Sequence, residues 1–188
     1  MQAAERPLIS VEDYLQGEKV SEVRHEYVDG RVYAMTGASK NHNRLTQRLA
    51  RLIGDGLTGG GCEAFASDVK VRISHDEEER FFYPDLLVEC PPLTEDAYYA
   101  ERPILVVEVL SRSTERADRS DKFHSYRRLH SLQEYVLVAQ DAQRVEVYRR
   151  GTQWDLDLYG PGDLVRLDSI GFSLPVAQLY TGIELRND

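Results

Sequence analysis

Two carboxylates stand inside apolar runs of the sequence, where a strand that only builds a core would not place them. Glu108 interrupts ILVVEVL, and Asp85 directly follows Pro84 in FFYPDLLVE. By strand alternation Glu108 shares a face with Val106 and Leu110, so its charge is expected to be buried. A buried charge without a partner is costly, and each carboxylate therefore needs a counter-charge.

A divalent cation would supply that counter-charge. If the two strands are neighbours, the carboxylates approach to about 4 Å and repel by on the order of 4 kcal/mol at an effective dielectric of about 20. Mg²⁺ or Mn²⁺, which prefer hard oxygen ligands, would remove the repulsion and activate a bound water. Taken singly, Asp85 could instead cap a turn and Glu108 could pair with a buried arginine. The two together favour a metal site.

Lys122 is the candidate cationic side chain. It precedes Tyr126 by four residues on a helix expected over residues 114–130, so it borders the apolar face of that helix and can reach inward. Asp118 lies one turn earlier on the same edge. The alternative is an exposed ion pair between Asp118 and Lys122, which would contribute only about 0.3–0.5 kcal/mol.

The elements that position these residues follow from short-range patterns. Asp29-Gly30, between HEYV and RVYAM, predicts a tight hairpin. Apolar residues at i, i+4, i+7, i+8 and i+12 from Leu45 predict an amphipathic helix over residues 41–57, and the stretch GLTGGG that overlaps its end predicts a loop. We also expect a short helix that begins at Ser10 and stops at Gly17, strands over 62–73, 81–89 and 104–110, and a strand pair formed by EYVLVAQ and VEVYRR.

This order of elements predicts one α/β domain over residues 1–188, with a central mixed β-sheet flanked by helices. The apolar runs are too short to span a bilayer, and the first residues lack the pattern of a signal peptide, so we expect a cytoplasmic protein without a membrane partner. The spacing of Cys62 and Cys90 matches neither a disulfide framework nor a zinc site, which predicts buried or half-buried thiols.

The charge distribution limits how nucleic acid could bind. A net charge of -9 excludes a broadly basic surface. Residues 112–128, however, carry six basic and three acidic side chains, so positive charge is concentrated there. Candidate phosphate contacts in this segment are Arg112, Arg116 and Arg119, and the alternative is an ordinary solvated helix face.

Three of the segments described above also resemble a known family. YPD at Tyr83–Asp85, ILVVEVLSRST at Ile104–Thr114 and DRSDKFHSY at Asp118–Tyr126 together resemble the Uma-type restriction-endonuclease family of the PD-(D/E)XK nuclease superfamily. The resemblance extends to RHEYVDG at Arg24–Gly30, to His42 and to EYVLVAQDAQRVEVYRR, and so covers most of the chain.

The resemblance implies a restriction-endonuclease-like fold with a metal site. Asp85 and Glu108 would bind Mg²⁺ or Mn²⁺, the carbonyl of Val109 would add a ligand, and a lysine would orient the attacking water. In the basic superfamily pattern the lysine follows the acidic residue by two positions, and Leu110 occupies that position here. The ammonium would therefore come from Lys122, on the following helix.

Two further residues are candidates for the same site. Glu26 could complete the acidic cluster from the hairpin, and an ion pair with Arg24 is the alternative. His42 could contact substrate, and the alternative is a surface or capping residue at the start of its helix.

The sequence thus predicts a metal-dependent endonuclease that hydrolyses nucleic acid, with DNA the expected substrate. The expected catalytic residues are Asp85, Glu108, Lys122 and Glu26. A homodimer would suit cleavage of both strands of a duplex. The alternative is a non-catalytic binding or regulatory protein that keeps the fold and the acidic pair, for which the acidic net charge favours a protein partner.

Overall fold

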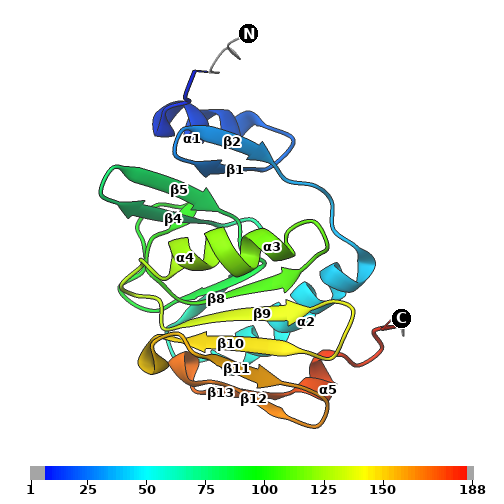
Figure 1. The fold of residues 1–188 in the computed structure, drawn as a ribbon. Helices are drawn as coiled ribbons and strands as arrows, with labels where there is room; N and C mark the ends of the chain where they lie inside the picture. Colours follow the sequence, from blue (N-terminus) through cyan, green and yellow to red (C-terminus); the bar gives the residue numbers. More distant parts are fainter. Residues whose placement is uncertain (1–6, 186–188) are drawn as a thin grey trace.

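The computed structural model describes residues 7–185, which form three β-sheets and the helices packed around them (Figure 1). The central sheet is mixed, because one pair of neighbouring strands is parallel and the other pairs are antiparallel. Its six strands lie in the order β11 (Leu156–Tyr159), β10 (Val145–Arg149), β9 (Glu134–Ala139), β8 (Pro103–Leu110), β6 (Leu86–Glu89) and β3 (Glu63–Ala66), with β8 and β9 parallel.

A second sheet carries the N-terminal hairpin. Its five strands lie in the order β2 (Arg31–Ala34), β1 (His25–Val28), β5 (Glu78–Phe82), β4 (Lys70–His75) and β7 (Tyr99–Ala100). Asp29 and Gly30 join β1 to β2 with φ angles of 47° and 87°, the left-handed conformation that this tight turn requires. The predicted hairpin is therefore confirmed. A third sheet pairs β12 (Leu164–Leu167) with β13 (Phe172–Pro175).

Helices cover both faces of the central sheet (Figure 1). Leu45, Leu49 and Ile53 of the long second helix pack with alternate residues of β8, including Val107. Tyr126 packs on the opposite face, in a cluster with Val106 of β8. Apart from the short 3₁₀ turns η2 (Arg150–Thr152) and η3 (Asp168–Ile170), the helices are α1 (Val11–Val20), α2 (Lys40–Gly56), α3 (Glu115–Ala117), the π-helical turn η1 (Asp118–Lys122), α4 (Phe123–Tyr126) and α5 (Val176–Leu179).

Two predicted strands are each broken in two. The segment 62–73 forms β3 and β4, which belong to different sheets, because Ser67 turns the chain with a φ of 61°. The segment 81–89 likewise forms β5 and β6, with the break at Tyr83–Asp85, where Pro84 cannot donate a ladder hydrogen bond. The chain thus crosses between the two larger sheets at both places, and Asp85 lies at the second crossing.

The first helix was predicted to stop at Gly17, but it continues to Val20. Ser10 caps it as expected, since its hydroxyl accepts a hydrogen bond from the backbone N–H of Asp13. A glycine inside a helix costs about 1 kcal/mol. Packing of Tyr14 against β1 and β5 offsets that cost, because its ring is buried in an aromatic cluster with Tyr27 and Phe81.

The expectation of free thiols is wrong. Cys62 and Cys90 form a disulfide, with their Cα atoms 4.1 Å apart. Antiparallel pairing of β3 with β6 places Glu63 opposite Glu89, so the two cysteines that extend these strands also face each other. Sequence spacing alone could not reveal this pairing. No helix within residues 7–185 is long and apolar enough to cross a membrane.

Candidate active site

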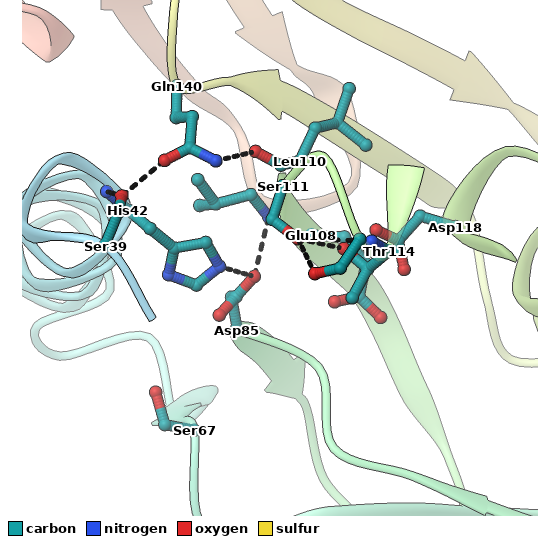
Figure 2. A network of polar contacts seen from close by, with 12 residues as sticks. Ser39, His42, Ser67, Asp85, Glu108, Leu110, Ser111, Thr114, Asp118 and Gln140 are labelled. Atoms are coloured by element: carbon teal, nitrogen blue, oxygen red, sulfur yellow. Dashed lines mark hydrogen bonds and ion pairs between the residues drawn. The ribbon is translucent and has the colours of Figure 1, made fainter. Parts of the chain in front are cut away.

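Strand register brings Asp85 and Glu108 together. Leu86 pairs with Val107 in the antiparallel β6–β8 ladder, so Asp85, one residue before β6, lies opposite Glu108. The Oδ2 atom of Asp85 accepts a hydrogen bond of 2.7 Å from the backbone N–H of Val109 (Figure 2). Strand β6, which Asp85 precedes, and strand β8, which contains Glu108, are therefore neighbours, as the metal-site hypothesis requires.

Lys122 lies among three carboxylates. Its Nζ atom is 2.8 Å from Oε1 of Glu26, 3.4 Å from Oε1 of Glu108 and 3.4 Å from Oδ1 of Asp118. Lys122, Glu108 and Asp118 are buried, and the Glu26 side chain is only 18% exposed. The alternative of an exposed Asp118–Lys122 pair is therefore wrong. So is the Glu26–Arg24 alternative, because Arg24 pairs with Asp68.

A π-helical turn presents these side chains to the sheet. The helix predicted over residues 114–130 extends from Glu115 to Tyr126, and its five residues Asp118–Lys122 are π-helical. The wider turn is typical of functional sites. The Tyr126 hydroxyl donates to Oε1 of Glu108 at 3.4 Å, and the Tyr135 hydroxyl donates to the carbonyl of Asp118 at 2.9 Å.

Burial and mutual charge shift the titration of the cluster. Burial raises the pKa of Glu108 well above its ordinary value, although the Lys122 ammonium acts in the opposite direction. The pKa of Asp118 is raised for the same reason. Burial alone would lower the pKa of Lys122, but Glu108, Glu26 and Asp118 outweigh it and raise that pKa. The three carboxylates therefore favour the ammonium form of Lys122.

His42 reaches the same site from the first turn of α2. Its Nε2 atom lies 3.2 Å from Oδ2 of Asp85, and its side chain is 15% exposed. Burial tends to lower the pKa of His42, but the hydrogen bond and charge of Asp85 outweigh it and raise that pKa. The surface alternative is therefore wrong. Ser39 caps the helix instead, since its hydroxyl accepts a hydrogen bond from the backbone N–H of His42.

Sequence reasoning missed the polar groups that hold α2 against the sheet. The Ser39 hydroxyl also donates to Oε1 of Gln140, and the amide of Gln140 donates to the carbonyl of Leu110 at 2.9 Å (Figure 2). This chain of contacts joins the start of α2, where His42 lies, to the end of β8, close to Glu108. The signal for a cap at Ser39, a hydroxyl before an amphipathic helix, was present in the sequence.

The site is rich in carboxylate oxygens, the donors that hard divalent cations prefer. The carboxyl groups of Glu26, Glu108 and Asp118 contact the Lys122 ammonium, and that of Asp85 contacts His42, so carboxyl groups outnumber the cationic side chains. Within residues 7–185, no three His, Cys, Asp or Glu side chains are grouped as a metal site. A set of two carboxylates with a backbone carbonyl is nevertheless sufficient for Mg²⁺, which usually keeps several waters.

The three candidate arginines differ in their surroundings. Arg119 is committed to ion pairs, since it donates to both carboxylate oxygens of Glu146 and to Glu115 at 3.0 Å. Arg112 and Arg116 are exposed, and neither forms an ion pair with another described residue. These two side chains are free to meet a phosphate, whereas the guanidinium of Arg119 is already neutralised.

Comparisons with known proteins agree on family and fold. The family model Uma2, described as "Putative restriction endonuclease", matches residues 11–177. Two proteins of Synechocystis sp. (strain PCC 6803) are similar along most of their length. The protein slr1290 is 39% identical over 180 residues, 94% of each chain. The protein sll1609 is 38% identical over 159 residues, 82% of this chain and 89% of its own.

A crystal structure has the same fold. It is described as "a putative nuclease belonging to DUF820" from Anabaena variabilis, and it superposes with a TM-score of 0.74 over 92% of this chain and 98% of that chain. The two sequences are 20% identical, so the likeness concerns the fold. The predicted α/β class, a central mixed sheet flanked by helices in a nuclease-like fold, is confirmed.

Proposed function

This chain belongs to the Uma2 family, and on that premise we propose that it is an endonuclease that hydrolyses nucleic-acid phosphodiester bonds with Mg²⁺ or Mn²⁺. DNA is the proposed substrate. One observation carries the proposal: Asp85, one residue before β6, lies opposite Glu108 of the neighbouring strand β8, beside the buried side chain of Lys122. A purely structural role would not require several carboxyl groups to be buried so close together.

Each side chain has a definite task in this proposal. Asp85, Glu108 and the carbonyl of Val109 would hold the cation, which when bound supplies a Lewis acid and an activated water. The Lys122 ammonium orients the nucleophile or stabilises negative charge that develops on the phosphate. Glu26 keeps this ammonium in place through its 2.8 Å contact.

His42 has a positioning task rather than a direct one. Its Nε2 atom and the backbone N–H of Val109 both contact Oδ2 of Asp85, at 3.2 and 2.7 Å. Two contacts on one oxygen fix the orientation of the carboxylate and leave Oδ1 available. A partner that orients a ligating carboxylate in this way commonly matters for metal affinity.

Phosphates beyond the scissile one would meet the exposed arginines. Arg112 follows β8, and Arg116 lies on α3, so both are close in sequence to the carboxylate cluster. Contacts of this kind position a nucleic acid without reading its sequence. The chain is acidic overall, so its binding would be local and strongly dependent on salt.

Cleavage of supercoiled plasmid in Mg²⁺ or Mn²⁺ tests the proposal. Wild-type protein should nick the plasmid, and Asp85→Asn and Glu108→Gln should each lower the cleavage rate at least about 100-fold. Replacement of residues that merely support metal ligands already lowers activity by about 10- to 100-fold, so loss of a ligand should cost at least as much. Glu63→Gln is the matched control, because Glu63 is an exposed carboxylate on a strand of the same central sheet. A single-stranded RNA incubated in parallel shows whether DNA is preferred.

Metal titration by calorimetry separates the proposal from its alternative. Wild-type protein should bind Mn²⁺, and Asp85→Asn should bind it at least about 10-fold more weakly. If wild-type protein neither cleaves nor binds metal, the endonuclease proposal fails. A non-catalytic binding or regulatory protein on a nuclease-like fold is then the better description.

A further inference from the structure

A pocket of about 600 Å³ lies beside the candidate active site and has no task in the chemistry proposed above. It is formed by α1, by Lys70 at the start of β4, and by the segment that leads into β7. Tyr83 lines it and precedes Asp85 by two residues, which span at most about 7 Å of chain. The Tyr83 side of the pocket therefore lies within a short reach of the carboxylate cluster.

A second connection runs through the hairpin. Arg24 lines the pocket, and Glu26, two residues later, contacts Lys122 in the carboxylate cluster. The Arg24 guanidinium donates to the carbonyl of Ser67 at 2.5 Å, and the Ser67 N–H donates to the carbonyl of Asp85 at 3.2 Å. These hydrogen bonds join the Arg24 side of the pocket to the backbone of Asp85.

The inner end of the pocket offers donors and acceptors in a fixed order. The Lys70 ammonium, only 5% exposed, donates to the Tyr83 hydroxyl at 3.3 Å. That hydroxyl in turn donates to Oε2 of Glu18 at 2.7 Å. Burial lowers the pKa of Lys70, because a charge is costly to bury. Polar groups held in this way suit the edge of a heterocycle.

Tyr98 supplies an aromatic ring at the outer end. Its side chain is 59% exposed, and the Lys19 ammonium lies 5.7 Å from its ring centre. The neighbouring Tyr99 differs, because its ring packs edge-on against Phe81 with centroids 5.7 Å apart. Tyr98 is thus the tyrosine of the pocket with a face available for stacking, and exposed aromatic rings are the usual platforms for bases.

The charges of the pocket favour a neutral ligand over a phosphate. Three cationic side chains line it, and they are outnumbered by the four carboxylates of Glu12, Glu18, Asp68 and Asp96. A phosphate would meet no net positive charge there. A planar, uncharged heterocycle with both donors and acceptors matches the lining, and the volume lies within the range of about 300–1,000 Å³ usual for small-molecule sites.

We propose that this pocket receives one nucleobase of the strand that is cleaved at the adjoining carboxylates, with Tyr98 stacking on the base and Lys70, Tyr83 and Glu18 facing its edge. The inference rests on the proposed nuclease function. A base inside a duplex must be unstacked to enter, which costs a few kcal/mol in general, so single-stranded or unpaired substrate should bind better than perfect duplex.

Equilibrium binding of a fluorescent single-stranded DNA 12-mer to the full chain in EDTA tests this, because binding is then measured without cleavage. Tyr98→Ala should weaken binding at least about 5-fold, which corresponds to the smallest usual loss of affinity when one stacked ring is removed. Tyr98→Phe, which keeps the ring, should bind within about 2-fold of wild-type protein. Tyr33→Ala is the matched control, since Tyr33 is a 50% exposed tyrosine of β2 outside the pocket. Thermal melting checks that each variant is folded.

Two further arms identify what enters the pocket. In a set of 12-mers, each strand lacks one base at a different position. Wild-type protein should bind one of these strands as weakly as Tyr98→Ala binds the intact strand. Tyr98→Ala should bind that same abasic strand no more weakly still, because both changes remove the same contact. Calorimetry with adenosine and cytidine tests free nucleosides.

The outcomes separate this inference from the proposed function. Equal binding by Tyr98→Ala and wild-type protein, with plasmid cleavage retained, overturns the pocket and leaves the nuclease intact. Tyr98-dependent binding of nucleosides by a protein that neither binds nor cleaves DNA overturns the strand and the proposed function but keeps a nucleobase pocket. No binding of either ligand, with no cleavage, overturns both.

Discussion

Replacement of Lys122 by methionine tests whether the carboxylate cluster is as charged and as buried as the structure indicates. Methionine keeps an apolar side chain beside Phe82, whose ring centre lies 5.6 Å from the Lys122 ammonium. It removes the cation that Glu26, Glu108 and Asp118 share. The perturbation is therefore almost purely electrostatic.

The size of the effect follows from these contacts. At separations of 2.8–3.4 Å and an effective dielectric of about 20, each contact amounts to on the order of 5 kcal/mol of attraction before desolvation is counted. Removal of one partner from a buried ion pair costs about 3–5 kcal/mol net. For a chain of this size, each kcal/mol lowers Tm by about 2–4 °C, which predicts a fall of about 6–20 °C.

Urea and thermal unfolding at pH 7 in EDTA measure the loss. Lys40→Met, at an exposed position on α2, is the matched control and should change the free energy of unfolding by less than about 0.5 kcal/mol. Combining Lys122→Met with Glu26→Gln should recover at least about 1 kcal/mol, because one uncompensated carboxylate is removed. A loss below about 1 kcal/mol for Lys122→Met would refute the reasoning.

Three further predictions concern other parts of the molecule. The Cys62→Ser, Cys90→Ser double variant should lose about 3–4 kcal/mol of unfolding free energy in the chain-entropy model, for a sequence separation of 28, and reductant should lower the stability of wild-type protein but not of the variant in urea titrations. Burial alone would raise the pKa of Glu146, but hydrogen bonds from Arg119 outweigh it and lower that pKa. The Arg119–Glu146 ion pair therefore stabilises the folded state fully above about pH 4.3, the ordinary pKa of a glutamate, and this contribution disappears as pH falls through the lower pKa of the folded state. Glu146→Gln should therefore flatten the decline of Tm with falling pH below about 4.5, and an unchanged slope would contradict the ion pair. Arg116→Ala should weaken DNA binding uniformly across sequences and reduce the slope of log K against log salt by about 0.9, measured by anisotropy at several salt concentrations; an unchanged slope would exclude a phosphate contact.

Local patterns in the sequence were sufficient to predict the helices and strands that are specified by residues close together in the chain. The apolar spacing from Leu45 predicted α2, Asp29-Gly30 predicted the hairpin, and the apolar run around Glu108 predicted β8. Each of these depends on backbone preference and on which face is buried, and both are encoded within a few turns of chain. The same logic marked Asp85 as a carboxylate out of place in a strand.

The strand breaks show where this logic stops. The apolar pattern of a segment is the same whether the segment continues as one strand in one sheet or divides between two sheets. The divisions at Ser67 and at Pro84 were therefore not predicted. They depend on which distant strands pair. The Cys62–Cys90 disulfide has the same origin, because β3 and β6 had to be neighbours before the cysteines could meet.

The sequence by itself determined the residue types of the candidate site, namely two strand carboxylates, a lysine at the edge of an apolar helix face, and a glutamate in the hairpin. Only the tertiary structure decided how they are grouped. It paired Glu26 with Lys122 rather than with Arg24, brought His42 to Asp85, and paired Arg119 with Glu146. The physical reason is that a charge finds its partner through space, across elements whose packing no local pattern records.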